Sequence, residues 1–512
     1  MRLLTCILAS VAAICLSASS AFANTLPSNT SAPVLSGTAT VGSTLSVTSG
    51  SWTGSPTSYY YGWQDCNSSG CTAISSAASK PTYTVQASDL GDKIKVTVTA
   101  YNSAGHDYAN SNESAVVTCT VAYPSVLHTS GQQLVNSVGC PIGLMKGFNV
   151  QPGSWAQSNY DAMADKGATI VRTVVFWNEL EPTEGTISST YVTALENHIA
   201  MLQSAGLYTT LDFYFGPGGT HEPSWAASTN PADSVMSDYI NNGEYATQYL
   251  AQLFGDTASA QYTPAVIGFG INEPTPDSDT VSTWVTTLMS QENEMTHWFR
   301  VYAPNWISVL AFGYSQSAPI PNASGSGQSW QTFTGAVADP ITAGTDPTTP
   351  GGNFIVDLHD YFMCLTSGSS ATFDGRQENG EDYWVNQGGT QVGTGNSTYT
   401  SYPISGVSEA TCKSQQAAYL APYTDYTSAG DADVPLMIGE WGWNPVTQTS
   451  GAASWIDDQL SNWSTASAAI EMQWDYNTNQ NQDPWAADPG TSAHGANSDG
   501  WQTATDAFFA GS

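Results

Sequence analysis

Hydrophobic and polar positions follow two different patterns along this chain of 512 residues. Up to about residue 117, short stretches such as "DKIKVTVTAYNSAG" (92–105) alternate at every second position and are separated by Gly, Ser, Pro and Asp. A period of two places successive side chains on opposite faces of a strand, so this part is predicted to be all β. From about residue 126, longer apolar runs alternate with segments of helical periodicity. That order predicts strands followed by helices.

The second part contains eight apolar runs of strand length. They lie at residues 144–150, 169–177, 208–215, 265–274, 306–313, 353–362, 434–443 and 468–476. Helical segments follow the second, third and fourth runs, at residues 191–206, 238–254 and 281–303. Repeated β-then-α order predicts a parallel sheet, and eight such units predict a (β/α)8 or TIM barrel. A small β-hairpin is expected just before the first of these strands.

The pattern divides the chain into four segments. Residues 1–23 are predicted to be a signal peptide, residues 24–117 a β-sandwich of immunoglobulin-like character, residues 118–125 a linker and residues 126–512 the barrel domain. In the sandwich, Trp63 and Tyr101 are expected in the core rather than at a ligand surface. The sequence shows no exposed row of aromatic residues, so this module is interpreted as a spacer or stabiliser. Polysaccharide binding and protein contact are the alternatives.

The N-terminus predicts export. A basic start, an apolar run and the small-x-small pattern Ala21-Phe22-Ala23 are typical of a secretory signal cleaved after Ala23. No later segment has the roughly 18 uninterrupted apolar residues that a spanning helix needs. The mature protein is therefore expected to be secreted and extracellular, with no membrane partner.

Six cysteines remain after the expected cleavage, an even number that suggests disulfides in an exported chain. Pairing between nearest neighbours is the hypothesis, because each pair closes a local loop: Cys66–Cys71, Cys119–Cys140 and Cys364–Cys412. A zinc site is the alternative. It is disfavoured because no C-x2-C pair is followed by a second such pair or by a pair of histidines.

The charge balance excludes some partners. The chain has 10 Lys and Arg against 43 Asp and Glu, a formal net charge of −33. Nucleic acids and anionic lipid surfaces are repelled by such a protein, whereas neutral carbohydrate is not. The acid excess either only maintains solubility or gives tolerance of acid, since few bases remain to repel one another once the carboxylates are protonated.

Polar and aromatic residues follow several of the predicted strands, and two of these residues are carboxylates. Glu273 ends the fourth strand and Glu440 the seventh. Active sites of such barrels lie at the carboxyl ends of the strands, so these two side chains are expected to face each other across the mouth. Opposed carboxylates are what cleavage of a glycosidic bond requires: one protonates the leaving oxygen and the other stabilises or attacks the anomeric carbon.

The motifs of the second part resemble those of glycoside hydrolase family 5, whose barrels place the acid/base and the nucleophile after strands four and seven. The resemblance covers residues 126–512. It rests on the motifs "LHTSGQQLVNSVGCPIGLMKGFN", Arg172 in "GATIVRTVVFW", "NEP" at 272–274, "HDY" at 359–361, "GEWG" at 439–442 and Trp474. The first part resembles the immunoglobulin-like modules found beside catalytic domains in secreted bacterial enzymes.

The resemblance implies roles for individual residues. Glu273 is the expected acid/base and Glu440 the expected nucleophile. Asn272 is expected to bond the 2-hydroxyl of the sugar, Arg172 to lie near Glu440 and keep it ionised, and Tyr361 to donate to Glu440.

Further residues are expected to bind the substrate. His359 contacts the sugar or orients the carboxylates, and Trp474 forms the floor on which a sugar ring stacks, with Trp441 as a second platform. The family commonly has a His at the end of the third strand, where this sequence has Tyr214 in "LDFYF". Either Tyr214 bonds the sugar itself or His221 supplies the imidazole.

The resemblance therefore implies a retaining β-glycosidase that needs no metal or cofactor. The leading expectation is a monomeric endo-β-1,4-glucanase acting on a neutral polysaccharide or oligosaccharide. A β-mannanase and an exo-acting β-glycosidase are alternatives, as is a non-catalytic carbohydrate-binding or adhesive protein. The presence of both carboxylates together with Arg172 and Tyr361 favours an enzyme.

Overall fold

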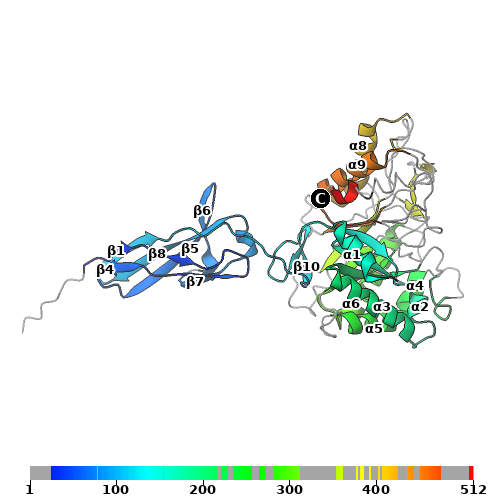
Figure 1. Ribbon diagram of the computed structural model, residues 1–512, viewed down its shortest axis with the longest axis horizontal. Coiled ribbons are helices and arrows are strands. Elements are labelled where there is room, and N and C mark those ends of the chain that lie inside the picture. The colour runs from blue at the N-terminus through cyan, green and yellow to red at the C-terminus, as the bar shows by residue number, and fades with distance from the viewer. Residues whose placement is uncertain are drawn as a thin grey trace, which may run out of the picture. The chain divides into compact units, whose positions relative to one another are not determined.

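The chain folds into two compact units, residues 1–120 and 121–512 (Figure 1). The computed structural model describes residues 25–77, 79–153, 155–215, 221–228, 235–255, 265–272, 281–311, 353–360, 376–378, 381–385, 391–393, 402–403, 406–424, 435–441, 450–473, 505 and 507–510. The expected signal peptide lies outside them.

The first unit consists of antiparallel strands. A four-stranded sheet has the order β6-β5-β8-β9, a three-stranded sheet the order β2-β3-β7, and β1 pairs with β4. The strands are β1 (Ser28–Ser31), β2 (Leu35–Ser36), β3 (Thr44–Val47), β4 (Ser51–Thr53), β5 (Ser58–Asn67), β6 (Gly70–Ala73), β7 (Thr82–Thr84), β8 (Lys93–Asn102) and β9 (Gly105–Asn110). Residues 25–117 are thus rich in β-structure, as predicted, and their immunoglobulin-like classification stays a prediction.

The core of this unit confirms one of the two aromatic assignments. Trp63 is 1% exposed, and its indole N–H donates to the Lys80 carbonyl at 2.8 Å. Tyr101, by contrast, is 39% exposed, so its assignment to the core was wrong. On β8 it follows Ala100, which is fully buried, and successive residues of a strand face opposite sides of the sheet.

The second unit is a closed barrel of eight parallel strands (Figure 1). All eight predicted strands are present, in sequence order around the barrel. They are β12 (Met145–Val150), β13 (Ile170–Val175), β14 (Tyr208–Tyr214), β15 (Val266–Asn272), β16 (Ile307–Ala311), β17 (Phe354–His359), β21 (Leu436–Trp441) and β22 (Ala468–Gln473). The predicted (β/α)8 fold class is therefore confirmed.

Helices lie outside the barrel. Those described are α1 (Gln157–Asp165), α2 (Trp177–Leu180), α3 (Ser189–Ser204), α4 (Val235–Asn242), α5 (Glu244–Phe254), α6 (Val281–Arg300), α8 (Glu409–Thr424) and α9 (Ala452–Thr465). The single helix expected over 238–254 is divided into α4 and α5 at Gly243, a residue of low helix propensity. Strands β18 (Arg376–Glu378), β19 (Glu381–Val385) and β20 (Gln391–Gly393) form a small antiparallel sheet. None of the described helices is long and apolar enough to cross a membrane.

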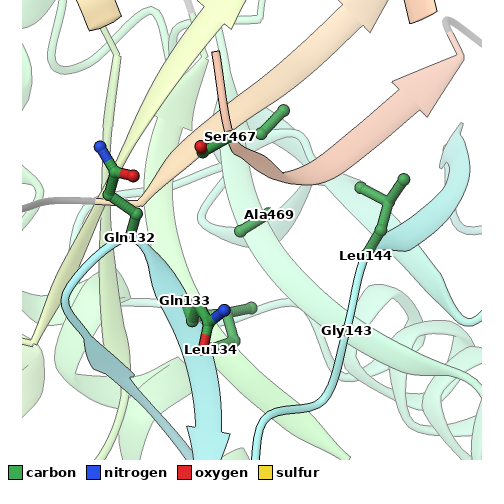
Figure 2. A pocket seen from close by; sticks show the side chains of 8 residues that line it. Gln132, Gln133, Leu134, Gly143, Leu144, Ser467 and Ala469 are labelled. Carbon is green, nitrogen blue, oxygen red and sulfur yellow. The ribbon is translucent and has the colours of Figure 1, made fainter. Parts of the chain in front are cut away.

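The predicted hairpin, β10 (Leu127–Ser130) with β11 (Gln133–Asn136), closes the amino-terminal end of the barrel. Its Leu127 and Leu134 are buried against an apolar layer inside the barrel that includes Met145 and Ile170. Between this hairpin, the residues just before β12 and the start of β22 lies a pocket of about 200 Å³ (Figure 2). This apolar end is opposite to the carboxyl ends of the strands.

The cysteines agree in part with the pairing hypothesis. Cys66 and Cys71 form a disulfide between β5 and β6, as expected. Cys119, Cys140 and Cys412 are each disulfide-bonded as well. Cys364 lies outside the described residues, and the remaining pairings stay predictions.

Candidate active site

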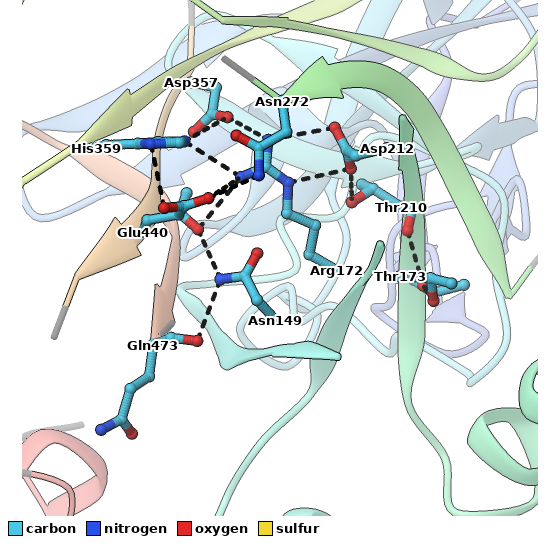
Figure 3. Close-up of polar contacts among 12 residues, drawn as sticks. Asn149, Arg172, Thr173, Thr210, Asp212, Asn272, Asp357, His359, Glu440 and Gln473 are labelled. Carbon is cyan, nitrogen blue, oxygen red and sulfur yellow. Dashed lines mark hydrogen bonds and ion pairs between the residues drawn. The ribbon is translucent and has the colours of Figure 1, made fainter. Parts of the chain in front are cut away.

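Arg172 occupies the centre of the barrel, above the apolar layer. Its guanidinium is fully buried and lies among carboxylates from three other strands (Figure 3). The Nη2 atom donates to Asp357 Oδ2 at 2.5 Å, and Nε lies 3.2 Å from Asp212 Oδ2. The Nη1 atom lies 3.7 Å from Glu440 Oε1. One planar cation therefore links β13 to β14, β17 and β21, a geometry for which the forked guanidinium is suited.

The charges of this cluster are strongly coupled. Burial opposes ionisation of Asp357, but Arg172 and then His359 outweigh it, so the pKa of Asp357 lies below its usual value. For Asp212 burial prevails over the attraction of Arg172, and its pKa is raised. Burial lowers the pKa of Arg172, while Asp212, Asp357 and Glu440 raise it, with a net increase. The cluster thus contains a permanent cation opposite a firmly ionised Asp357.

Glu440 lies next to this cation at the carboxyl end of β21 and is 3% exposed. Its Oε1 atom accepts a hydrogen bond of 2.7 Å from the Asn272 amide, and its Oε2 atom lies 3.2 Å from His359 Nδ1. His359 in turn has its Nε2 atom 3.5 Å from Asp357 Oδ2. Oε1 of Glu440 is therefore held by a hydrogen bond from another strand, and Oε2 faces the imidazole of His359, so each oxygen of the carboxylate has a defined neighbour (Figure 3).

The strands that supply these groups are irregular where they end. The pairing of β17 with β21 shifts register between Leu358 and His359, and that of β21 with β22 shifts between Ile438 and Trp441. Such irregularities re-aim side chains and are common beside active sites. Here they coincide with the positions of His359 and Glu440.

Two glycines make room for the partners of Arg172. A β-carbon at Gly439 would lie 1.8 Å from Asp357 Oδ1, and one at Gly270 would lie 2.6 Å from Asp212 Oδ1. Each glycine faces the barrel interior beside one carboxylate, so both are required by close approach rather than by backbone conformation. This explains one Gly in each of the motifs "GFGINEP" and "MIGEWGW".

Replacing Gly439 with Ala is expected to lower the free energy of unfolding by about 3 kcal/mol, because the added methyl group displaces Asp357 from Arg172. Activity is expected to fall as well, since Glu440 is the next residue. Chemical denaturation and steady-state kinetics measure the two effects. Gly153→Ala is the matched control, because its nearest neighbour would be Trp155 Nε1 at an ordinary 3.5 Å. Equal stability of the two variants would contradict the steric argument.

Tyr214 and His221 lie together with Phe176. The His221 ring stacks on Phe176 with centroids 4.0 Å apart and lies 5.7 Å from the Tyr214 ring. The chain returns to β14 there, because the His221 N–H donates to the Phe215 carbonyl at 2.8 Å. Burial lowers the pKa of His221. Tyr214 pairs with Asn272 in the barrel register, so Tyr214 and the adjacent His221 both lie near the mouth of the barrel. Which of the two residues contacts the sugar stays open.

Three of the predicted site residues lie outside the described residues: Glu273, Tyr361 and Trp474. Their roles remain predictions. The structure brings together Arg172, Asn272, His359 and Glu440.

Trp441 was expected to be a second sugar platform, and the structure contradicts this. Its side chain is fully buried, with ring centroids 6.0 Å from Trp455, 6.2 Å from Trp463 and 4.7 Å from Phe508. A sugar platform requires an accessible ring face, so the expectation for Trp441 was wrong. The residue after Glu440 points away from the barrel interior and packs against α9.

Asp212 and Asp357 were missed by the sequence analysis. A signal was available, because each precedes a predicted site residue by two positions, Tyr214 and His359, and thus shares its face of the strand. A buried carboxylate requires a partner, and Arg172 lies on the strand that pairs with that of Asp212. Asp360 of the "HDY" motif was also missed: it accepts hydrogen bonds from Trp463 Nε1 at 2.7 Å and Gln459 Nε2 at 3.2 Å, which fasten β17 to α9.

Buried carboxyls predict greater stability in acid. Burial raises the pKa of Glu471, 1% exposed, to about 7 despite Lys146 at 4.0 Å. The native state therefore holds this proton more tightly than the unfolded chain. The stabilisation is fully present below about pH 4.5 and is lost as the pH rises through 7, with a difference on the order of 3 kcal/mol.

The melting temperature is accordingly expected to be higher at pH 5 than at pH 8, in line with the acid-tolerance hypothesis. Glu471→Gln, which keeps the shape of the neutral acid, is expected to reduce this difference. Glu244→Gln on the exposed start of α5 is the control. The explanation fails if both variants show the pH dependence of the parent.

No cluster of three or more His, Cys, Asp or Glu with the geometry of a metal site occurs among the described residues.

Comparison with known proteins identifies the family. The model of the family described as "Cellulase (glycosyl hydrolase family 5)" matches residues 135–481. A search of curated proteins found no match.

Solved structures similar to the chain include endo-glycoceramidase II from Rhodococcus sp. (16% identity over 75% of this chain and 80% of that one, TM-score 0.49). Another is an exo-β-1,4-mannosidase from Opitutaceae bacterium strain TAV5 (16% identity over 68% of this chain and 54% of that one, TM-score 0.42). A third is an endogalactoceramidase (16% identity over 68% of this chain and 74% of that one, TM-score 0.43). Similarity at this level carries no information about the substrate. The family match, however, spans more than half of the chain and contains the strands that hold Arg172 and Glu440. The protein therefore belongs to glycosyl hydrolase family 5 and is a retaining glycoside hydrolase.

Proposed function

We propose that the protein is an exported endo-acting β-1,4-glucanase that cleaves its substrate by double displacement, with Glu440 as nucleophile and Glu273 as acid/base. The observation that carries the proposal is the fixed orientation of Glu440. One of its oxygens is held by Asn272 and Arg172, and the other faces His359. A carboxylate held in this way has lost the rotational freedom that would oppose attack on an anomeric carbon.

In the first step a Glu440 oxygen attacks the anomeric carbon while Glu273 donates a proton to the leaving oxygen. The positive charge of Arg172 stabilises the carboxylate form of the nucleophile. In the second step a water molecule, deprotonated by Glu273, releases the sugar and restores Glu440.

Asn272 has a double role in this proposal. Its amide N–H donates to Glu440, and its Oδ1 atom is buried without a hydrogen-bond partner among the described residues. A free acceptor next to the nucleophile is suited to the 2-hydroxyl of the sugar, a contact that strengthens in the transition state.

Support for a neutral glucan comes from two observations. The matched family model is that of cellulases, and the net charge of −33 disfavours polyanionic substrates. An activity panel on soluble β-1,4-glucan, mannan, xylan and aryl glycosides, read with product lengths, tests the proposal. Fastest cleavage of glucan to mixed oligosaccharides is expected. Fastest cleavage of mannan, or release of single sugars from chain ends, would replace the proposal by a β-mannanase or an exo-acting β-glycosidase.

Export is proposed on the N-terminal pattern and on the disulfides, which persist in oxidising compartments. N-terminal sequencing of protein secreted by a producing cell is expected to start at Asn24. Retention of residues 1–23 on a cell-associated protein would contradict it. Sedimentation analysis of the same material tests the expected monomer.

A further inference from the structure

The four-stranded sheet of the first unit presents three exposed tyrosines on one face. Tyr60 of β5 is 41% exposed, Tyr101 of β8 39% and Tyr108 of β9 64%. In the register, Tyr60 is opposite Thr99, and Thr99 is opposite Tyr108. Tyr101 is two residues beyond Thr99 on the same strand, so all three rings project from the same side of the sheet.

The opposite side of this sheet is the core of the unit. Ile94, Val96, Val98 and Ala100 of β8 are fully buried, and they alternate with Lys95, Thr97, Thr99 and Tyr101. The tyrosines are therefore not required for the packing of the core. An exposed group of large aromatic rings on a folded surface calls for a binding explanation.

The tyrosine face has a defined shape. Tyr60 and Tyr108 are two strand spacings apart, about 10 Å, with the smaller Thr99 between them. The Tyr60 ring lies beside Gly62, where a β-carbon would be 3.6 Å from Tyr60 Cε1. Because Gly62 has no side chain, the space next to the Tyr60 ring stays open. The Tyr101 ring lies 5.3 Å from the ring of His106, its partner on β9. The result is a shallow, ring-lined surface that crosses three strands.

Hydrogen-bonding groups lie beside the rings on the same face. Thr97 donates to Asn110 Oδ1 at 2.7 Å, and its hydroxyl is 3.5 Å from Gln64 Oε1. Along each strand, positions that face the core alternate with positions on the tyrosine side. On that side there is no carboxylate between Tyr60 and Gln64 of β5, between Lys95 and Tyr101 of β8, or between His106 and Asn110 of β9. The charged side chains of the sheet therefore do not interrupt the surface between the three tyrosines with a carboxylate.

We propose that this tyrosine face binds a single chain of a neutral polysaccharide. Tyrosine rings offer apolar faces to the C–H faces of pyranose rings and a hydroxyl to the sugar hydroxyls. The amide and hydroxyl side chains between the rings match a ligand that is rich in hydroxyls and uncharged. The choice of carbohydrate as the occupant rests on membership in a glycosidase family, not on the proposed glucan specificity. The first unit then attaches the enzyme to its polymer, and is not only a spacer.

Binding is tested with the full chain carrying Glu440→Gln, so that the polymer is not consumed. The triple variant Tyr60→Ala/Tyr101→Ala/Tyr108→Ala is compared with this parent in adsorption isotherms on insoluble cellulose, mannan and xylan. Loss of three stacking rings is expected to weaken adsorption on at least one polymer about tenfold or more. Tyr245→Ala, which removes a tyrosine 47% exposed on α5, and Val34→Ala in the first unit are the matched controls.

In the active enzyme, the triple variant is expected to keep its kcat/KM on a short soluble substrate and to lose rate on the insoluble polymer. Cooperative thermal unfolding verifies that the variant is folded. If it is not, Tyr108→Ala alone serves, because its ring is the most exposed of the three.

Equal adsorption of the triple variant and its parent on every polymer would overturn the proposal. So would a concentration-dependent dimer that the triple variant abolishes, because the face would then bind a second copy of the chain. The test is independent of the substrate assignment: tyrosine-dependent binding to mannan by an enzyme inactive on glucan leaves this proposal intact and refutes only the glucanase.

Discussion

Replacing Glu440 with Gln is expected to lower kcat by on the order of 10⁴-fold or more, the scale observed when one member of a hydrolytic unit is removed. The substitution retains the size of the side chain and a carbonyl oxygen that can accept from Asn272. It removes the negative charge that the first step requires. Initial rates on an aryl glycoside, with thermal unfolding measured in parallel, test the expectation.

A second variant separates the nucleophile from a supporting carboxylate. Glu440→Ala leaves a space in which a small external anion such as azide can attack the anomeric carbon. Azide is expected to restore turnover of an activated aryl glycoside and to yield the glycosyl azide of inverted configuration. Glu244→Gln, on the exposed surface, is the control. Substantial residual activity in Glu440→Gln, or failure of azide to react in Glu440→Ala, would assign the nucleophile to another residue.

Replacing Arg172 with Ala is expected to have the largest effect on stability, about 3–5 kcal/mol, because it leaves buried carboxylates without their cation. Asp212 and Asp357 are both fully buried, and Arg172 Nη2 bonds each of them. Activity is expected to be lost as well, since Glu440 loses its positive neighbour. Denaturant unfolding at pH 7 and steady-state kinetics measure the two effects.

Neutralising the carboxylates together with the cation separates stability from catalysis. The triple variant Arg172→Met/Asp212→Asn/Asp357→Asn is expected to regain much of the stability lost in Arg172→Ala, because no buried charge is left without a partner. It is not expected to regain activity. Arg172→Lys is the conservative comparison, since one ammonium group cannot bond both aspartates as the guanidinium fork does. If Arg172→Ala unfolds at the same denaturant concentration as the parent, the charge cluster does not stabilise the fold.

Much of the second unit could be predicted from the chain alone, because the relevant signals are local. Each apolar run of strand length formed the expected barrel strand, and the hairpin β10–β11 preceded the first of them. The position of Glu440 at a strand end followed from the end of the run and from the rule that barrel sites lie at carboxyl ends. Asn272 was found in the same way, whereas the role of Arg172, in the middle of β13, was implied by the resemblance to family 5.

The errors and omissions arose where the direction of a side chain depends on register. Trp441 follows Glu440 directly, and the irregular pairing between Ile438 and Trp441 decides which of the two faces the interior. Tyr101 was assigned to the core, although the strand pairing places it on the outer face together with Tyr60 and Tyr108. Three tyrosines on three strands do not form a row in the sequence.

The sequence by itself determined the fold class, the order of the strands and the strand ends that supply the site, because hydrophobic periodicity and chain breaks are properties of neighbouring residues. Only the tertiary structure decided which buried charges meet. Arg172 joins Asp212, 40 positions away, and Asp357, 185 positions away. A buried ion needs a partner, but closure of the barrel determines which one it finds. The same closure sets Glu440 between Asn272 and His359 and turns a strand-end carboxylate into an oriented one.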